Sequence, residues 1–415
     1  MVDLLIRNAR LLTGEMAHLA IDAGRVVGVH SAAVTSNSEL DAGDNLVLPS
    51  FVNAHLHLDK ALTVGPATDW RRGDFQESID MTLDMRRTYT MESLLQRGRA
   101  VLRSCVAHGT GAVRAFADVG TVGGTLGAEA LIKLRDEFRE LIDVQVVAFP
   151  QEGFFRDLGA DRLLEQAMEA GCDVVGAFPW FELSNDLARR HIDRAFEIAR
   201  QFNADLHAFV DDEPVAPHTE DLSGLAPATI ANNWEGRVTA SHACGLASYD
   251  EHLADRTMRL VASAGISIVS NAQISLVSKC QSAPEPRPRG ITRVRQLLEH
   301  QVNVATAQDD IADPYYPFGR GDMLEVASFL AHTAQLYRPS ETPTVIDMIT
   351  TNPAKAMRLG DYGVAVGDRA DLVILDGARD ATEALRLQPP RRWVIKQGRV
   401  VAETRVSRMV AGDPM

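Results

Sequence analysis

Residues 47–57 read VLPSFVNAHLH, a β-rich apolar run that ends in a pair of histidines. Seven similar runs follow, and most are separated by helix-length segments with apolar residues three or four positions apart. The runs span residues 111–119, 141–151, 172–180, 205–211, 237–246, 267–275 and 302–310. Eight strands alternating with helices in about 300 residues favour a (β/α)8 barrel. The count alone does not exclude a doubly wound sheet.

The two ends of the chain have a different pattern from the middle. Residues 1–46 and 362–403 contain short alternating strands separated by glycine turns, and neither end can form an adequate core alone. We therefore expect both ends to pair into one small β-domain beside the barrel. The expected boundaries are 1–48 and 361–415 for the β-domain and 49–360 for the barrel. Loops are expected over 60–88 and over 280–290, where three prolines exclude a helix.

The composition is that of a soluble globular protein, with 415 residues of which 46% are hydrophobic and 24% charged. No apolar run reaches the roughly 18 residues of a membrane span, and Asp3 and Arg7 interrupt the stretch that a signal peptide would need. Four scattered cysteines without a CxxC pair suit a reducing compartment, so we expect a cytoplasmic protein. The net charge of −14 argues against nucleic acid and membrane partners, because both are polyanions.

Histidines and one aspartate recur at the ends of the expected strands. His55 and His57 lie two positions apart, so the strand period places both on one face. His207 ends the fifth strand, His242 the sixth and Asp309 the eighth, at the barrel end where this fold carries its chemistry. An isolated HxH is more often a pair of surface histidines than a metal site. Histidines and a carboxylate at one level of a barrel, however, suit a divalent zinc or first-row metal ion with a position left for water.

Further stretches along the chain match a known family. They are SFVNAHLHLDK (50–60), VVAFPQEG (146–153), DVVGAFPWFE (173–182), RVTASHACG (237–245), RGITRVRQLLE (289–299), QDDIADPYYPFGRGDMLEV (308–326) and LVILDG (372–377). On these motifs the chain resembles the amidohydrolase superfamily, specifically its cytosine deaminase-like branch. The resemblance implies an α/β fold, a TIM barrel with a small β-sandwich domain built from both chain ends.

The same resemblance implies the residues of the active site. One divalent metal ion per chain, zinc or iron with manganese also possible, would be held by four ligands: His55, His57, His207 and Asp309. His242 would lie beside the water on that ion and contact the reacting group. The implied substrate-binding residues are Gln151, Asp310, Tyr315 and Trp180. Hydroxide on the metal would attack an sp² carbon that carries a nitrogen leaving group, and Asp309 would accept the proton of the water.

The sequence departs from the cytosine deaminase pattern at the residue that moves protons. Those enzymes carry a glutamate three positions after the fifth-strand histidine, and here that position is Val210. Strand alternation would turn Asp211 toward the side of His207, although a solvated loop is the slightly favoured explanation of the acidic run DDE. Gln308 also replaces the usual histidine before Asp309. We therefore expect weak or absent activity on cytosine.

Lys60 connects the chain to a second group in the same branch. The stretch HLHLDK is similar to that of the N-isopropylammelide aminohydrolases, in which the lysine lies at the active site and an alkylamine leaves an s-triazine ring. Lys60 would hold an oxygen of the substrate or lend a proton, so we count it with His242 and Asp309 as catalytic. The simpler alternative is a surface lysine at the rim of the barrel.

The sequence thus predicts a hydrolase that cleaves an exocyclic C–N bond of a small nitrogen heterocycle such as a pyrimidine or an s-triazine. Strands three and four contain no lysine that could bridge two metals, so we expect one ion. Two alternatives remain open, a cyclic or linear amide hydrolase and a non-catalytic binder of metal or heterocycle. A small-molecule substrate is the expected partner, and the chain is expected to form a homo-oligomer.

Overall fold

The structure is a computed structural model that describes residues 1–30, 34–65, 68, 74–214, 220–281, 283–407 and 409. Eight parallel strands, β6 to β13, follow one another across a single sheet in the order of the chain. The two edges of this sheet meet, because Asp309 N donates to His55 O and His57 N donates to Asp309 O. The expected TIM barrel is confirmed. Its strands are β6 (Phe51–His57), β7 (Thr110–Asp118), β8 (Asp143–Phe149), β9 (Val174–Ala177), β10 (Asp205–Val210), β11 (Val238–His242), β12 (Ser267–Ser270) and β13 (Val304–Thr306).

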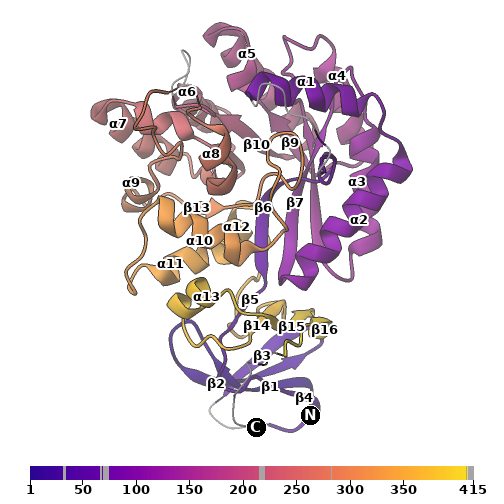
Figure 1. Ribbon diagram of the computed structural model, residues 1–415, viewed down its shortest axis with the longest axis vertical. Helices are drawn as coiled ribbons and strands as arrows, with labels where there is room; N and C mark the ends of the chain where they lie inside the picture. Colours follow the sequence, from indigo (N-terminus) through magenta and orange to yellow (C-terminus); the bar gives the residue numbers. More distant parts are fainter. Residues whose placement is uncertain are drawn as a thin grey trace.

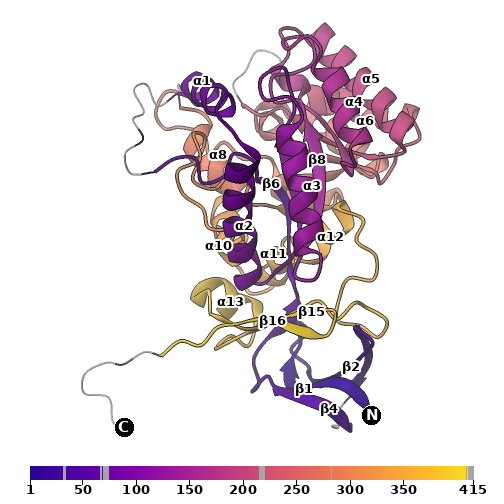
Figure 2. The same ribbon diagram turned by 90° about the vertical axis from the view of Figure 1, so that its right-hand side faces the viewer.

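Helices surround the barrel on its outside (Figures 1 and 2). Helix α5 illustrates why they form, because Ser184 caps its start, Asn203 ends it in the left-handed conformation, and its buried residues recur at helical spacing. The α-helices of the barrel are α1 (Phe75–Arg86), α2 (Met91–Ala107), α3 (Leu126–Phe138), α4 (Ala160–Glu169), α5 (Asn185–Phe202), α6 (Asp221–Ala231), α7 (Glu251–Ser263), α8 (Ala272–Ser278), α9 (Val294–Glu299), α10 (Met323–Thr333), α11 (Thr342–Asp347) and α12 (Thr351–Ala356). Two 3₁₀ turns, Pro179–Phe181 and Cys244–Ser248, follow β9 and β11.

The chain ends pair into the small sandwich, which lies at the opposite end of the barrel from helix α1 (Figures 1 and 2). One four-stranded sheet has the order β3-β2-β1-β4 and the other the order β16-β15-β14-β5. Apolar residues from both sheets, including Ile6, Leu19 and Ile374, form their shared core. The elements are β1 (Val2–Arg10), β2 (Met16–Asp22), β3 (Arg25–His30), β4 (Ser36–Asp41), β5 (Val47–Pro49), β14 (Leu372–Leu375), β15 (Arg391–Lys396), β16 (Arg399–Glu403) and α13 (Ala381–Leu387).

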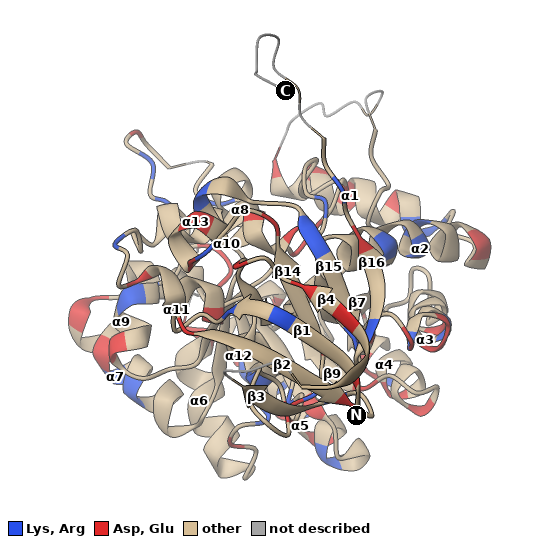
Figure 3. Cartoon of the chain, turned by 90° about the horizontal axis from the view of Figure 1, so that it is seen from below, with Lys and Arg blue, Asp and Glu red and all other residues tan. Residues whose placement is uncertain are grey.

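Acidic and basic residues are interspersed along the outer helices, as α7 and α9 illustrate when the molecule is seen from the sandwich end (Figure 3). Among the described residues, no helix combines the length and the apolar composition needed to cross a bilayer. All four cysteines are free and buried.

Three local expectations about the barrel were wrong. The loop expected over 60–88 contains helix α1, which Asp74 caps by accepting a hydrogen bond from Glu77 N. The strand expected over 267–275 ends at Ser270, and helix α8 begins two residues later. The strand expected over 302–310 ends at Thr306, so Asp309 lies beyond it. At β12 the apolar character of the segment continues past the point where its backbone hydrogen bonding changes.

Candidate active site

The two histidines of β6 lie beside the carboxylate of Asp309 at the carboxyl end of the barrel. Their Nε2 atoms are 3.4 Å apart, and Asp309 Oδ1 lies 3.2 Å from that of His55 and 3.5 Å from that of His57. All three side chains are buried. Period two places both imidazoles inside the barrel, and the backbone bonds that close the sheet bring the aspartate next to them. Two nitrogen atoms and one oxygen atom therefore face one small volume.

Asp309 and His242 both adopt a left-handed backbone conformation, with φ of 67° and 68°. This region costs a residue with a side chain on the order of 1–3 kcal/mol, and it persists only where the surroundings enforce it. At Asp309 the barrel-closing hydrogen bonds do so. The turn at each strand end directs both side chains toward one point, with His242 Nε2 3.5 Å from Asp309 Oδ2.

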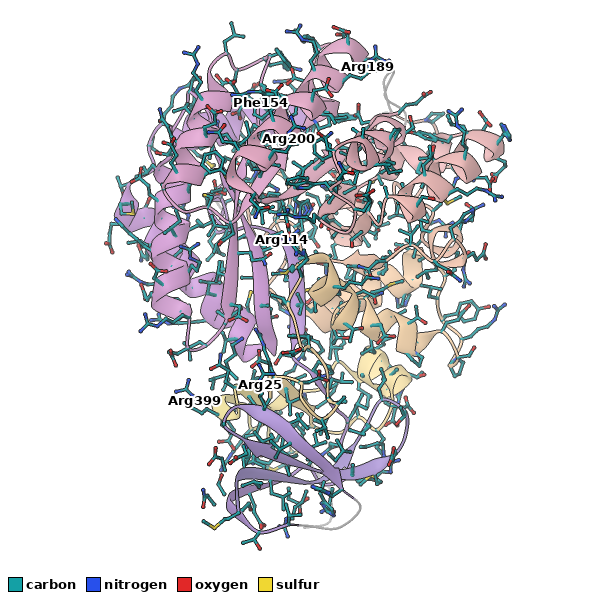
Figure 4. All side chains as sticks on the ribbon, turned by 180° about the vertical axis from the view of Figure 1, so that it is seen from behind. Arg25, Arg114, Phe154, Arg189, Arg200 and Arg399 are labelled. Carbon is teal, nitrogen blue, oxygen red and sulfur yellow. The ribbon has the colours of Figure 1, made fainter. Side chains whose placement is uncertain are left out.

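His207 lies next to this group and takes part in a buried chain of polar contacts. Arg114 Nη1 is 3.2 Å from His207 Nδ1, His207 Nε2 is 2.5 Å from Ser241 Oγ, and Ser241 Oγ is 2.7 Å from His55 Nδ1. A guanidinium only donates hydrogen bonds, so Nδ1 accepts and Nε2 carries the proton. Arg114 itself lies deep inside the barrel, among the strands (Figure 4). For His207 to bind a metal through Nε2, that proton must leave.

The donor set suits a divalent cation. Three groups of described residues bring ligand atoms within 4.8 Å of one another: His55 with His242 and Asp309, His57 with Asp309 and Asp310, and His57 with Asp59 and Asp118. Burial lowers the pKa of His57 and of His207 well below the usual value, which leaves neutral imidazoles that can ligate. His207 belongs to none of these groups, so the four-ligand set expected from the sequence stays a prediction.

Asp309 is ionised and His242 neutral in this environment. Burial alone would raise the pKa of Asp309, but His55 and His242 outweigh it and hold that pKa far below its usual range. Burial lowers the pKa of His242 to about 4, against the opposing effect of Asp212. A carboxylate and a neutral imidazole can both accept hydrogen bonds.

A narrow pocket opens above these residues. His57, His242 and Asp309 form part of its lining. Four aromatic rings form further walls, and they suit a flat ring ligand. Two lysines and further polar side chains contribute the remaining polar groups. The additional lining residues are Lys60, Phe75, Gln151, Phe178, Phe209, Asp212, Ile274, Ser278, Lys279, Asp310 and Tyr315.

Lys60 is a buried pocket residue rather than the surface lysine of the simpler alternative. Its Nζ donates to Gln151 Oε1 over 2.8 Å, lies 3.4 Å from Asp118 Oδ2 and stands 4.8 Å from the centre of the Tyr315 ring. Burial alone would lower the pKa of Lys60, but Asp118 outweighs it and the pKa lies above its usual value. Lys60 is therefore a firmly charged donor and a poor source of a transferable proton.

The other expected pocket residues differ in where they lie. Gln151, Asp310 and Tyr315 line the pocket, whereas Trp180 does not. Trp180 packs behind it, with its ring 5.9 Å from that of Phe178 and 6.1 Å from that of Phe75. The 3₁₀ turn that follows β9 carries it there.

Comparison with known proteins gives the family. The amidohydrolase family model matches residues 71–402. The N-isopropylammelide isopropyl amidohydrolase of Pseudomonas sp. strain ADP is 31% identical over 411 residues, which cover 97% of this chain and 98% of that protein. The chain belongs to the amidohydrolase family. The pterin deaminase of Rhizobium rhizogenes is also 31% identical, over 89% of this amidohydrolase and 84% of its own length.

A solved structure extends the likeness to the whole fold. The 5-methylcytosine deaminase of Klebsiella pneumoniae, liganded with 5-fluorocytosine, is 32% identical and superposes with a TM-score of 0.93, over 98% of this amidohydrolase and 99% of that chain. The family and branch expected from the sequence are confirmed. So is the enzyme class, a hydrolase of C–N bonds outside peptides.

The acidic run after β10 is arranged differently from the expected alternation. Asp211 has φ of 47°, which ends the strand pattern and turns its side chain away from the pocket. It accepts hydrogen bonds from Asp221 N, Leu222 N and the Tyr249 hydroxyl. The carboxylate that lines the pocket is that of Asp212.

Several functional neighbours escaped the sequence analysis because their partners are distant in the chain. Asn271 Nδ2 donates to Asp309 Oδ2 over 2.9 Å, Ser241 joins two histidines, and Arg114 contacts His207. The only sequence signal for Ser241 and Asn271 is their position at or near strand ends, which many structural residues share, and Arg114 lies in the middle of β7.

Proposed function

We propose that this amidohydrolase releases ammonia or an amine from a small nitrogen heterocycle, such as a pyrimidine or an s-triazine, with one divalent metal ion. The observation that carries the proposal is the convergence of His55, His57 and Asp309, of which His57 and Asp309 line a pocket with aromatic walls. Zinc, iron and manganese all accept this mixture of imidazole and carboxylate ligands.

His55, His57, His207 and Asp309 would hold the ion in this proposal. The ion, when bound, lowers the pKa of a water molecule and so supplies a nucleophile near neutral pH. Asp309 Oδ2 and His242 Nε2 are 3.5 Å apart, which lets both contact the same attacking group. The ionised carboxylate accepts the proton of that group, and the imidazole stabilises the charge that develops on the ring substituent.

Lys60, Gln151 and Asp310, which also line the pocket, support a substrate that carries oxygen on its ring. Lys60 can only donate, so its bond to Gln151 Oε1 turns the amide Nε2 of Gln151 toward other acceptors. The Lys60 ammonium and the Gln151 amide N–H are therefore two adjacent donors. Such a pair suits a substrate that carries a ring oxygen next to a ring nitrogen, because both atoms can accept hydrogen bonds. Asp310 adds a further polar group, since its buried Oδ1 has no hydrogen-bond partner among the described residues, and burial beside Asp313 raises the pKa of its carboxyl group well above the usual value.

The proposal is tested by a substrate screen with the purified, metal-loaded enzyme. Pyrimidines, pterins, s-triazines and hydantoin-like rings are assayed with separate readouts for ammonia, amine and ring opening. Release of ammonia or amine is expected, with cytosine a poor substrate because Val210 lies in the apolar core and offers no carboxylate. Ring opening without amine release would instead identify a cyclic amide hydrolase, and metal retention without any turnover would identify a binder.

Lys60→Met is expected to lower kcat/KM about ten- to a hundredfold, since one charge-assisted hydrogen bond to substrate is lost. The metal content should not change. The fold should also persist. Asp118 loses Lys60 as an ion-pair partner in this variant, but Arg86 remains 3.3 Å from its carboxylate. Steady-state kinetics and metal analysis measure both effects.

Lys133→Met, on the exposed side of α3, is the matched control and should behave as the wild type. A fully active Lys60→Met enzyme would leave Lys60 without a part in the reaction.

We also propose that the protein is a cytoplasmic homo-oligomer. Four free, buried cysteines are compatible with a reducing compartment. Light scattering coupled to size-exclusion chromatography measures the mass in solution, and a purely monomeric peak would contradict the oligomer.

A further inference from the structure

Asp212 and Lys279 form a buried ion pair against His242. Lys279 Nζ is 2.6 Å from Asp212 Oδ2, and Asp212 Oδ1 is 3.2 Å from His242 Nδ1. Asp212 and Lys279 both line the pocket and are buried, and Lys279 stands 5.5 Å from the centre of the Phe75 ring. One carboxylate thus faces a lysine with one oxygen and the imidazole with the other.

The two ring nitrogens of His242 have different sets of neighbours. Nδ1 lies 3.2 Å from a carboxylate oxygen of Asp212, a contact short of hydrogen-bond geometry, and neither atom has any other partner among the described residues. Nε2 faces the amide of Asn271 at 3.4 Å and Asp309 Oδ2 at 3.5 Å. That amide also donates to Asp309 Oδ2, an acceptor only, so it presents its NH₂ group to Nε2. Asp212 Oδ1 is the nearer of the two carboxylate oxygens, and the Asn271 NH₂ group needs an acceptor, so the proton is favoured on Nδ1 and the lone pair on Nε2.

We propose that Asp212 is a positioning residue that holds His242 in the tautomer with its proton on Nδ1, so that Nε2 remains an acceptor beside Asp309. This inference rests on the proposed place of His242 next to the reacting group. Asp212 lies two positions after Val210, the last residue of β10. The positive φ of Asp211 turns the side chain of Asp212 into the pocket, so the inference assigns this carboxylate a role in the site.

Lys279 determines how Asp212 presents its oxygens. Burial alone would raise the pKa of Asp212, but Lys279 and His242 outweigh it, so the carboxyl group is ionised. A lysine ammonium has donors and no acceptor. Whatever replaces Asp212 must therefore place an acceptor toward Lys279, and this leaves its second atom toward His242.

Because of this constraint, Asp212→Asn should move the imidazole proton of His242 to the other ring nitrogen, rather than only remove a contact. The asparagine would turn its carbonyl oxygen to Lys279 and its NH₂ group to His242 Nδ1. A donor at that place forces the imidazole proton to Nε2, so the acceptor beside Asp309 is lost. We expect kcat to fall about ten- to a hundredfold, as when a carboxylate that orients a histidine is removed, with a smaller change in KM.

The test reads the tautomer directly by nitrogen NMR of the zinc-loaded enzyme labelled with ¹⁵N-histidine. The signals of His242 are identified by their loss in His242→Asn. The wild type should carry its proton on Nδ1, Asp212→Asn should carry it on Nε2, and both should hold the same amount of zinc. In Asp212→Asn/Lys279→Met the amide is free to turn, and the proton should return to Nδ1.

Asp211→Asn is the matched control, because Asp211 is equally buried yet contacts helix α6 and Tyr249 instead of His242. It should lower the melting temperature while the His242 tautomer stays unchanged. A wild-type proton on Nε2, an unchanged tautomer in Asp212→Asn, or a reversed tautomer that persists in the double variant would overturn the proposal. These readouts need no substrate, so a failed substrate screen would count against the proposed function alone.

Discussion

Asp309→Ala is expected to abolish hydrolysis and to leave the purified protein with little of the wild-type metal. Asp309 supplies the carboxylate oxygen that lies within 3.5 Å of both histidines of β6. Alanine leaves those imidazoles without an anion, and a buried divalent charge without a carboxylate is strongly disfavoured. Elemental analysis of the purified variant measures the metal, and the best substrate of the screen measures the activity.

Asp205→Ala is the control for this variant. Asp205 begins β10 at the other end of the barrel and pairs with Arg237 and Arg358, so its loss should affect stability and leave the metal in place. Full activity of Asp309→Ala, or wild-type metal content, would remove Asp309 from the set of ligands.

His242→Asn is expected to keep its metal and to lose about a hundred- to a thousandfold in kcat, the usual effect of removing one aligned group at the transition state. His242 Nε2 lies 3.5 Å from Asp309 Oδ2, on the pocket side of the carboxylate. Metal content and kcat, measured on the same preparation, separate a reacting group from a ligand.

This variant also decides between His207 and His242 as a ligand. The ligand atoms of His242 lie in one group with those of His55 and Asp309, whereas His207 contacts Ser241. Loss of metal in His242→Asn would make His242 the ligand and contradict its proposed role. His300→Asn, on the outside of the barrel beside Asp255, should change neither quantity.

The parts of this protein that follow from local patterns could be predicted from the sequence. Each barrel strand is a short apolar run with helix-forming sequence beside it, so the eight strands were found by periodicity. The HxH pair was visible for the same reason, because period two alone places His55 and His57 on one face. The pairing of the chain ends followed from their inability to bury a core separately.

The parts that depend on single backbone angles and distant contacts could not be predicted. Alternation pointed to Asp211, but its left-handed conformation places Asp212 in the pocket instead. Lys279 becomes meaningful only when helix α8 carries it against Asp212. Helix α1 was missed because a capping aspartate, rather than a clear apolar stripe, marks its beginning.

A metal titration of the metal-free enzyme tests the central claim most directly. Zinc is added stepwise, and the initial rate of amine or ammonia release is followed with the best substrate of the screen. The rate should rise in proportion to the added zinc and level off at about one equivalent per chain, as a single site with histidine and carboxylate ligands requires. A rate that is already maximal without metal, or that levels off only at two equivalents, would contradict the account.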